Sequence, residues 1–391
     1  MEKIHRIWAE IDLDAIAHNM RIIRANTDKN AKVMAIVKAD AYGHGVVAVA
    51  KTMLENGADV FGVACVDEAV QLRMAGFTVP ILILGATMPH EAEAILDYDI
   101  TTAAFDYDAS AHLSSVAVKK GKKAKVHIKL DTGMCRIGIV AERSDAVSKI
   151  KKIALLDGIE VTGMFSHFSC ADTEDEEHTF LQYKRFVNVA DALEKEGMKI
   201  PVKHISNSAA IFRYKNMHLD MVRAGIVSYG LYPSDLIEDC GLIPAMSFKT
   251  AVARVETLNP GDKVSYGAIY VADKKIKSAT LMVGYADGYS RLLSDKARAI
   301  INGEYVKIIG RICMDQCMAD VTNVNNIAVG DVATLFGREG DKFIPVEEIA
   351  DIMGTINYEI ICMISKRVPR VYKKGGRYID ELNYISELSK K

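Results

Sequence analysis

A surplus of positive charge is missing from this chain of 391 residues, which holds 49 Lys and Arg against 51 Asp and Glu. Proteins that bind nucleic acid ordinarily present a basic surface, so nucleic acid is not an expected partner. No apolar run approaches the ~18 residues of a membrane-spanning helix, and no membrane association is expected. The opening MEKIHRIWAEIDLDAI has no long apolar core and no small-residue cleavage site, which argues against a signal peptide and favours a cytoplasmic protein.

Cysteines with the spacing of a metal site or a disulfide framework are missing as well. The seven cysteines are scattered and odd in number, which favours reduced thiols. Cys313 and Cys317 are four residues apart, but no second pair of Cys or His completes a zinc site, so no metal is expected. The first strand-helix turn, KADAYGHG, does not match the G-x-G-x-x-G pattern of a dinucleotide-binding fold.

Up to residue 240, short runs rich in Val and Ile alternate with amphipathic helical patterns. Such runs are typical of strands buried on both faces, and repeated strand-helix units indicate a parallel sheet. Eight units of this kind fit a closed (β/α)8 TIM-like barrel, with an open doubly wound sheet as the alternative. The expected strands begin at Lys32, Asp59, Val79, Ile100, Ala124, Glu160, Val202 and Met221.

Beyond Cys240 the pattern changes to alternating strand-like stretches punctuated by NPGD and by glycines. The segment AIINGEYVKII places an Asn-Gly pair between two such stretches, which predicts a β-hairpin. We therefore expect a barrel over residues 1–240 and an all-β, mainly antiparallel domain over 241–391. The opening strand, about residues 1–12, is left open as a strand of either domain.

Polar residues gather at the ends of the expected barrel strands, where the active sites of barrels lie. Lys38 ends the first of these strands, in AIVKADAYGHG. A partly desolvated lysine is a nucleophile toward carbonyls, although a lysine whose stem covers apolar surface is the ordinary alternative. The same rim should receive Lys129, Asp131, Arg136, His167, Asn207, Ser208, Arg223 and Gly225. Their convergence predicts a binding or catalytic site.

A lysine and a phosphate cradle on one rim suggest pyridoxal 5′-phosphate, which lysines hold as a Schiff base. Ser208 opens a helical turn and Gly225 lets backbone N–H groups come close, as in barrel phosphate sites. The alternatives are a helix cap for Ser208 and a strand-end turn for Gly225. Arg223, if it faces the pyridine nitrogen, offers no acceptor and leaves that nitrogen unprotonated. The weaker electron sink favours simple proton exchange at Cα.

These residues lie in motifs that resemble the alanine racemase family of bacteria. In the order of that family, and over nearly the whole chain, they are WAEIDLDAIAHN, AIVKADAYGHG, IKLDTGMCRIG, SHF, ISNSAA, VRAGIVSYGLYP, VSYG, VGYADGYSR, GRICMDQ, GTINYEI and RVPRVY. The resemblance implies an isomerase that interconverts L- and D-alanine by two-base proton transfer on pyridoxal phosphate. It also implies a homodimer with active sites shared between subunits, and a supply of D-alanine for peptidoglycan.

The resemblance implies a role for each matching residue. Lys38 would carry the cofactor and act as the base on one face, and Tyr266 of the other subunit would act on the opposite face. His167 and Arg223 would form the hydrogen-bonded chain that helps the tyrosine to ionise. The remaining roles are phosphate binding by Tyr42, Ser208, Gly225, Ile226 and Tyr358, carboxylate binding by Arg136 and the backbone of Met314, orientation of Arg136 by a carbamylated Lys129, and a substrate entrance lined by Tyr285 and Asp315.

Three alternatives stay open at this point. A racemase of another small amino acid, such as serine, fits the same residues. A barrel-type decarboxylase needs a site that expels carboxylate, which suits Arg136 less well. A non-catalytic carrier of pyridoxal phosphate would consist of a barrel alone, whereas this chain adds a domain with the expected second base.

Overall fold

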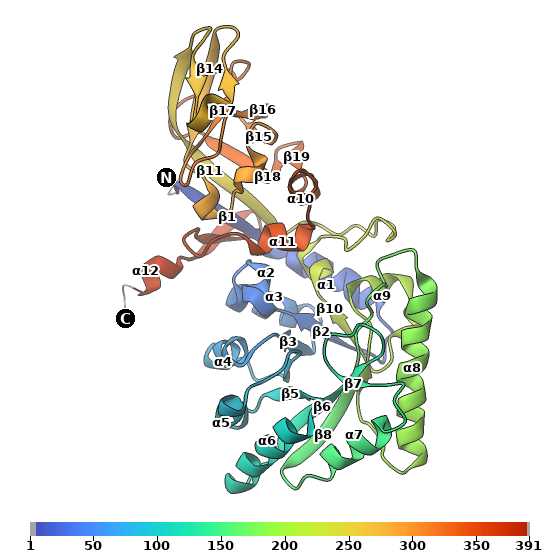
Figure 1. Ribbon diagram of the computed structural model, residues 1–391. Coiled ribbons are helices and arrows are strands. Elements are labelled where there is room, and N and C mark those ends of the chain that lie inside the picture. Colours follow the sequence, from blue (N-terminus) through green and yellow to red (C-terminus); the bar gives the residue numbers. More distant parts are fainter. Residues whose placement is uncertain (1–4, 389–391) are drawn as a thin grey trace. The chain divides into compact units, whose positions relative to one another are not determined.

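The computed structural model describes residues 5–388 and divides into two compact units (Figure 1). The first, which we call the barrel unit, consists of Ala15–Ala41 and Val46–Ile243. The second, which we call the β unit, consists of the chain up to Asp14, of Tyr42–Gly45 and of the chain from Pro244 onward. Each unit is therefore built from segments that are separate in the sequence.

Eight parallel strands form the sheet of the barrel unit, in the order β10-β2-β3-β4-β5-β6-β8-β9. Their bounds are β2 (Lys32–Ile36), β3 (Val60–Val63), β4 (Ile81–Ile83), β5 (Thr101–Ala104), β6 (Ala124–Asp131), β8 (Ile159–Phe165), β9 (Lys203–His204) and β10 (Met221–Ala224), and the two-residue β7 (Ile139–Val140) pairs with β6. Backbone bonds of 3.0 Å, from Asp220 N to Lys203 O and from Arg223 N to Ser206 O, join the two ends of this order. The predicted (β/α)8 barrel is confirmed, and the open doubly wound alternative is wrong.

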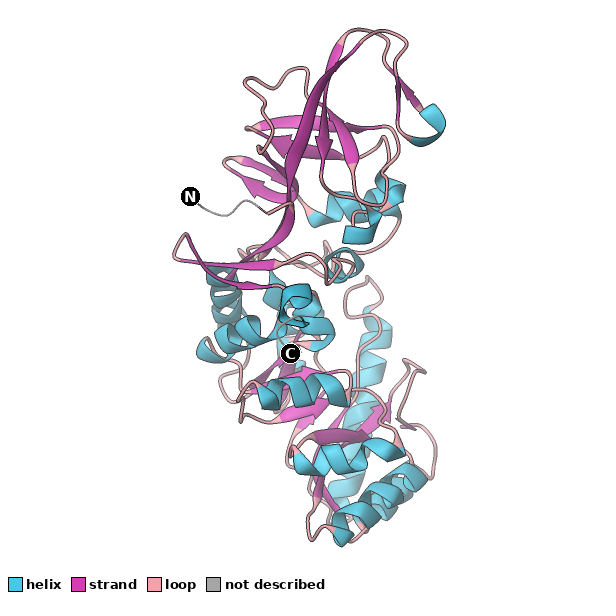
Figure 2. Cartoon of the chain, turned by 90° about the vertical axis from the view of Figure 1, so that its left-hand side faces the viewer, coloured by secondary structure: helices cyan, strands magenta, loops and turns pink. Residues whose placement is uncertain are grey.

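Helices of the barrel unit lie around its strands (Figure 2). They are α1 (Leu13–Asn26), α3 (Val46–Glu55), α4 (Val66–Met74), α5 (Ala92–Asp97), α6 (Tyr107–Lys119), α7 (Ala146–Ala154), α8 (Glu176–Lys195) and α9 (Ser208–Arg213), with the 3-10 turns η1 (Pro89–Glu91), η2 (Lys215–Met217) and η3 (Ile226–Tyr229). Two of the helices begin where an aspartate accepts a backbone N–H, Asp106 for α6 and Asp175 for α8. With helices over the sheet, all four residues of β3 are buried, which explains the continuous apolar runs.

The β unit holds a sheet of ten strands in the order β19-β18-β15-β16-β17-β14-β11-β1-β20-β21. The bounds are β1 (Ile7–Asp12), β11 (Met246–Leu258), β14 (Ile276–Leu281), β15 (Arg298–Ile301), β16 (Glu304–Ile309), β17 (Cys317–Asp320), β18 (Val332–Glu339), β19 (Lys342–Ile344), β20 (Arg370–Lys374) and β21 (Arg377–Leu382), and β12 (Lys263–Val264) pairs separately with β13 (Tyr270–Val271). Neighbouring strands in this sheet run antiparallel, except that β1 and β20 run parallel. The mainly antiparallel class is confirmed, and Asn302-Gly303 turns β15 into β16 as predicted.

The sequence pattern had indicated an all-β domain, but the β unit also contains helices. It contains α10 (Val346–Met353), α11 (Asn357–Cys362) and α12 (Tyr384–Leu388), and the 3-10 turns η4 (Tyr266–Ala268), η5 (Tyr285–Asp287) and η6 (Arg291–Leu293). In α10 the buried residues are Val346, Ile349 and Ala350, which repeat at helical spacing, and Gly354 ends the helix with a φ of 72°. A helical period within a strand-rich region explains the difference.

The opening strand β1 belongs to the β unit. It pairs antiparallel with β11, where Ile7 is opposite Thr250, and parallel with β20, where Ala9 is opposite Arg370. Five of its six residues are buried. Across residues 5–388, no helix is both long enough and apolar enough to span a membrane.

Candidate active site

Lys38 opens a left-handed turn directly after strand β2. The φ angles of residues 39–42 lie between 51° and 55°, a region that non-glycine residues rarely enter. Left-handed helical backbone costs about 1–2 kcal/mol per residue, so other contacts must hold the turn. Glu68 accepts the Ala39 N–H at 2.6 Å, and Asp40 accepts a backbone N–H at the start of α3 at 2.8 Å. Strain of this kind is typical of functional sites, and here it fixes where Lys38 leaves the sheet.

The strand register brings the expected phosphate residues to the same end of the sheet as Lys38. Strand β10 lies beside β2, with Ala224 opposite Ala35, so Gly225 and Lys38 both follow the C-terminal ends of neighbouring strands. The Gly225 N–H donates to Ser208 Oγ at 2.9 Å. This contact leaves the serine hydroxyl hydrogen for an anion.

Ser208 is not the cap of helix α9. The cap is Asn207, whose side-chain oxygen accepts the Ala210 N–H at 3.1 Å. The helix-cap alternative for Ser208 is therefore wrong. The serine instead contacts the loop after β10, which suits the predicted phosphate cradle.

Arg223 lies inside the barrel unit at 3% exposure and is surrounded by acceptors. Its guanidinium donates to His167 Nδ1 and His204 Nδ1, both at 3.0 Å, and to the carbonyls of Ser166 and Ile205. Arginine carries donors only, so the groups around it must accept. The predicted contact between Arg223 and His167 is thus present within one chain.

Two further histidines in this cluster were not predicted. His204 contacts Arg223, and its Nε2 lies 2.9 Å from Nδ1 of His127. The two-residue period of a strand places His127 on the same face as Lys129 in β6, but it does not show what His127 contacts. His204 ends the two-residue strand β9, which is too short to show such a period.

Burial and neighbouring cations set the charges in the cluster. Burial, with Arg223 and Arg136 nearby, lowers the pKa of Lys129 to about 7, while Asp131 opposes the shift. Burial and Arg223 hold the pKa of His167 well below its usual value, and Arg136, Lys129 and Lys38 act in the same direction. Burial and Arg136 lower the pKa of Arg223 to about 9, so it stays charged at neutral pH. Several cations thus converge on one end of the barrel unit, which suits phosphate or carboxylate.

In the β unit, three predicted residues gather on an exposed edge. Tyr266, Tyr285 and Met314 are 69%, 44% and 52% exposed. Tyr285 N donates to Cys313 O and Ala286 N to Met314 O, both at 3.1 Å, which joins η5 to the 313–314 loop. Ser265 Oγ, next to Tyr266, donates to Arg311 O at 2.6 Å, so the same loop also reaches η4.

Other predicted residues of the β unit form two smaller contacts. The ring centroids of Tyr42 and Tyr358 are 6.2 Å apart. Asp315 accepts from Arg367 at 2.6 Å, and Arg367 also donates to the fully buried Asp287 at 2.7 Å. The structure thus assembles the predicted residues in two groups, one in each unit. Among residues 5–388, no group of three or more His, Cys, Asp or Glu side chains is placed to hold a metal ion.

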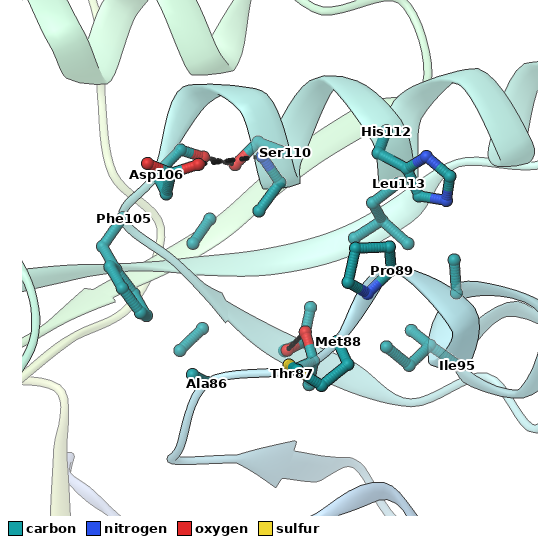
Figure 3. A pocket seen from close by; sticks show the side chains of 15 residues that line it. Ala86, Thr87, Met88, Pro89, Ile95, Phe105, Asp106, Ser110, His112 and Leu113 are labelled. Carbon is teal, nitrogen blue, oxygen red and sulfur yellow. Dashed lines mark hydrogen bonds between the residues drawn. The ribbon is translucent and has the colours of Figure 1, made fainter.

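A cavity of about 190 Å³ in the barrel unit is not part of this cluster (Figure 3). It lies beyond the ends of β4 and β5, and its apolar lining includes Met88, Phe105 and Leu113. Ser110 in the lining uses its hydroxyl within helix α6, where Ser110 Oγ donates to the Asp106 carbonyl at 2.6 Å. The lining comes from residues 86–113 and contains none of the predicted site residues.

Comparisons with known proteins agree with this geometry. Residues 11–233 match the family model "Alanine racemase, N-terminal domain", and residues 245–372 match "Alanine racemase, C-terminal domain". An alanine racemase of Clostridium perfringens strain SM101 is 48% identical over 384 residues, covering 98% of this chain and 99% of the relative.

Solved structures show the same likeness. An alanine racemase of Clostridium difficile 630 matches with a TM-score of 0.94 at 39% identity, covering 97% of this chain and 99% of the other. A histidine racemase of Leuconostoc mesenteroides matches with a TM-score of 0.87 at 31% identity, covering 95% and 98%. The chain therefore belongs to the alanine racemase family of pyridoxal-phosphate-dependent isomerases, as the sequence motifs had indicated.

Proposed function

We propose that this enzyme interconverts L- and D-alanine by moving the Cα proton between Lys38 on one face of the substrate and Tyr266 on the other. The observation that carries the proposal is the position of Lys38, which follows the strand beside that of the buried Arg223. A racemase needs a proton donor on both faces of a flattened Cα. One lysine and one tyrosine meet that need, because both side chains can hold and release a proton.

The residues around Lys38 fit pyridoxal 5′-phosphate. When bound, this cofactor supplies an electron sink that acidifies the Cα–H of an attached amino acid. Lys38 would hold its aldehyde, and Ser208 with the backbone of Gly225 and Ile226 would hold its phosphate. The Gly225 N–H donates to Ser208 Oγ at 2.9 Å, which leaves the serine hydroxyl hydrogen for the phosphate, and the cations of the cluster balance an anion. Arg223, a group without acceptors, would leave the pyridine nitrogen unprotonated.

Substrate carboxylate binding falls to Arg136, which Lys129 would orient as a carbamate. The pKa of Lys129, lowered by burial to about 7, leaves much of its amine neutral at pH 7. A neutral amine adds CO2, forms an N–C bond and releases one proton, which leaves an anion in place of the buried amine. That change relieves the crowding of positive charge around Arg223 and gives Arg136 a partner.

The exposed edge of the β unit supports a homodimer. Tyr266, Tyr285 and Met314 are large and mostly or half exposed, and Ile269 beside Tyr266 is 45% exposed. Large apolar side chains exposed in this way are a feature of surfaces that bind another protein. In the proposed dimer, Tyr266 of one chain acts on substrate held by Lys38 of the other, and His167 is its hydrogen-bond partner. The proposal extends to a cytoplasmic enzyme that supplies D-alanine for peptidoglycan.

The decisive experiment is a chiral separation of products from the holoenzyme. L-alanine, L-serine and L-histidine are supplied separately, because a histidine racemase shares this fold at 31% identity. The expected result is an equal mixture of L- and D-alanine, with far slower conversion of the other two. A preference for serine or histidine would contradict the assignment of alanine as the substrate. If none of the amino acids is converted, the proposed racemase activity is wrong.

Shared sites can be tested by mixing subunits. A Lys38→Ala chain and a Tyr266→Phe chain are inactive alone, but a hybrid dimer contains one intact site if the residues come from different chains. Random mixing should restore up to about a quarter of the wild-type activity. Absence of rescue in dimers shown to be hybrid would place both residues of a site in the same chain.

A further inference from the structure

Four side chains form a line of hydrogen bonds inside the barrel unit. Arg223 donates to His167 Nδ1 through Nη2 and to His204 Nδ1 through Nη1, both at 3.0 Å. The line continues from His204 Nε2 to His127 Nδ1 over 2.9 Å. His127 and His204 are 8% and 0% exposed. The proposed reaction uses Arg223 and His167 and assigns nothing to His127.

The far end of this line is at the opposite mouth of the barrel. His127 lines a cavity of about 240 Å³ whose other walls include Lys32, Val60 and Met221, the first residues of three parallel strands. Lys38 and Gly225, by contrast, follow the last residues of their strands. The line therefore connects the site end of the barrel with its other end.

Hydrogen-bond chemistry fixes the tautomer of each histidine in the line. Arginine has no acceptor atom, so His167 and His204 must both accept at Nδ1. Burial and Arg223 lower the pKa of His204 far below its usual value, which keeps the ring neutral with its hydrogen on Nε2. His204 then donates from Nε2 to His127 Nδ1. His127 in turn carries its hydrogen on Nε2, and His167 offers an Nε2–H beyond Arg223.

Strand β8 holds both inner rings in place. The His204 ring stacks on Phe165, with ring planes 4° apart and centroids 5.1 Å apart. Two residues earlier, a Cβ at Gly163 would lie 2.6–2.7 Å from three atoms of the His127 ring. Such a contact is too short, so glycine at this position leaves the space that the His127 ring fills.

We propose that His127 is a positioning residue for racemisation, because its Nδ1 accepts the His204 N–H and so keeps His204 Nδ1 free to accept from Arg223. This proposal rests on the proposed function of Arg223 and His167. Without the acceptor at residue 127, the buried N–H of His204 has no partner. The His204 ring then shifts to give this N–H a partner, which moves Nδ1 away from the guanidinium of Arg223. His167 loses its orientation with it.

Two variants at position 127 separate hydrogen bonding from packing. His127→Asn keeps an acceptor oxygen near Nδ1, and His127→Leu fills similar space without one. We expect kcat to fall about tenfold in His127→Leu with KM nearly unchanged, and His127→Asn to retain most activity. Equal loss in both variants, or loss in neither, overturns the proposal.

A second pair of variants controls for crowding in the core. A Cβ at Gly163 meets His127 at 2.6 Å, and a Cβ at Gly62 on strand β3 meets Ile36 at 2.5 Å, away from the line. Both Gly→Ala variants should lower the denaturation temperature. Only Gly163→Ala should also lower kcat. Equal kcat values at equal stability loss would mean that the position of the His127 ring does not matter.

The tautomers can be read directly from imidazole ¹⁵N shifts of the holoenzyme, assigned by His→Asn variants. We expect Nε2 protonated and Nδ1 unprotonated in His127, His167 and His204. A proton on His204 Nδ1 overturns the inference whether or not alanine is turned over. If wild-type enzyme fails to racemise alanine while the shifts are as expected, the proposed function fails and the arrangement of the line stands.

Discussion

The two units present their parts of the candidate site in opposite ways. In the barrel unit, Arg223 and Lys129 are 3% and 4% exposed and lie within a hydrogen-bonded cluster. In the β unit, Tyr266 and Met314 are 69% and 52% exposed on a short turn and a loop. The barrel group is positioned by its own chain, through backbone carbonyls, histidines and a strained turn. The β group is exposed, which agrees with the proposal that its residues complete a site in another subunit.

The largest effect should come from breaking the barrel group at Lys38. Lys38→Ala removes both the cofactor anchor and one proton carrier, so racemisation should fall by at least ~10³-fold. The visible absorption of the bound cofactor should change with it. Lys32→Ala, at the start of the same strand, is the matched control and should leave both unchanged. Full activity in Lys38→Ala would remove the basis of the proposal.

The exposed β group is tested by Tyr266→Phe, which should lower racemisation by ~10²–10³-fold while the cofactor still binds. Since L- and D-alanine are equally stable, the ratio of kcat/KM in the two directions cannot report which face is affected. Exchange of Cα–H in D2O can. D-alanine should still exchange through Lys38 without inverting, and exchange of L-alanine should be slow. Similar slowing for both enantiomers would contradict the face-specific role.

Lys129 should matter for substrate binding more than for proton transfer. Lys129→Ala removes the proposed anion beside Arg136, so KM should rise by about tenfold with a smaller change in kcat. In the wild type, ¹³CO2 should give a carbamate ¹³C signal that disappears in this variant. Such a signal in both proteins would show that the carbamate is elsewhere.

The smallest effect concerns the free energy of unfolding at acid pH. It should depend on the buried His127 and not on the exposed Tyr266. Burial and Arg223 lower the pKa of His127 to about 4, below the unfolded value near 6.5. As pH falls from about 6.5 to 4, His127 binds a proton in the unfolded chain but stays neutral in the folded chain. The free energy of unfolding therefore decreases over this window and levels off below it.

Urea unfolding from pH 7 to 4 measures this decline. His127→Asn should show a shallower slope than the wild type. Tyr266→Phe should show the wild-type slope, since tyrosine does not titrate in that window. Identical slopes for His127→Asn and wild type would mean that His127 is not a neutral buried group.

The barrel could be predicted because strands buried on both faces appear in the sequence as continuous apolar runs. Lys38, His167 and Arg223 could be placed at strand ends because each of them lies at the end of such a run. His127 and His204 could not, because one inward-facing histidine in a strand looks like any core residue until its neighbour across the sheet is known. Their contact joins residues 77 positions apart.

Backbone strain was also beyond the sequence pattern. The glycines of AYGHG indicate a turn, but the residues with φ near 50° begin at Ala39, before the first glycine. Non-glycine residues carry almost no signal for that conformation, since their side chains disfavour it. It is held by Glu68 from another strand-helix unit, a contact that only the fold supplies.

The place of β1 has a consequence for how the protein is made. Its neighbours in the sheet, β11 and β20, begin at Met246 and Arg370, so a ribosome finishes the barrel unit before either partner exists. During that interval both edges of β1 lack a hydrogen-bonded neighbour, and an apolar strand in this state is prone to aggregation. A C-terminal fragment expressed from Pro244 would lack this interior strand of the sheet. A permuted chain that carries residues 5–14 after the C-terminus would shorten the time during which β1 has no partner.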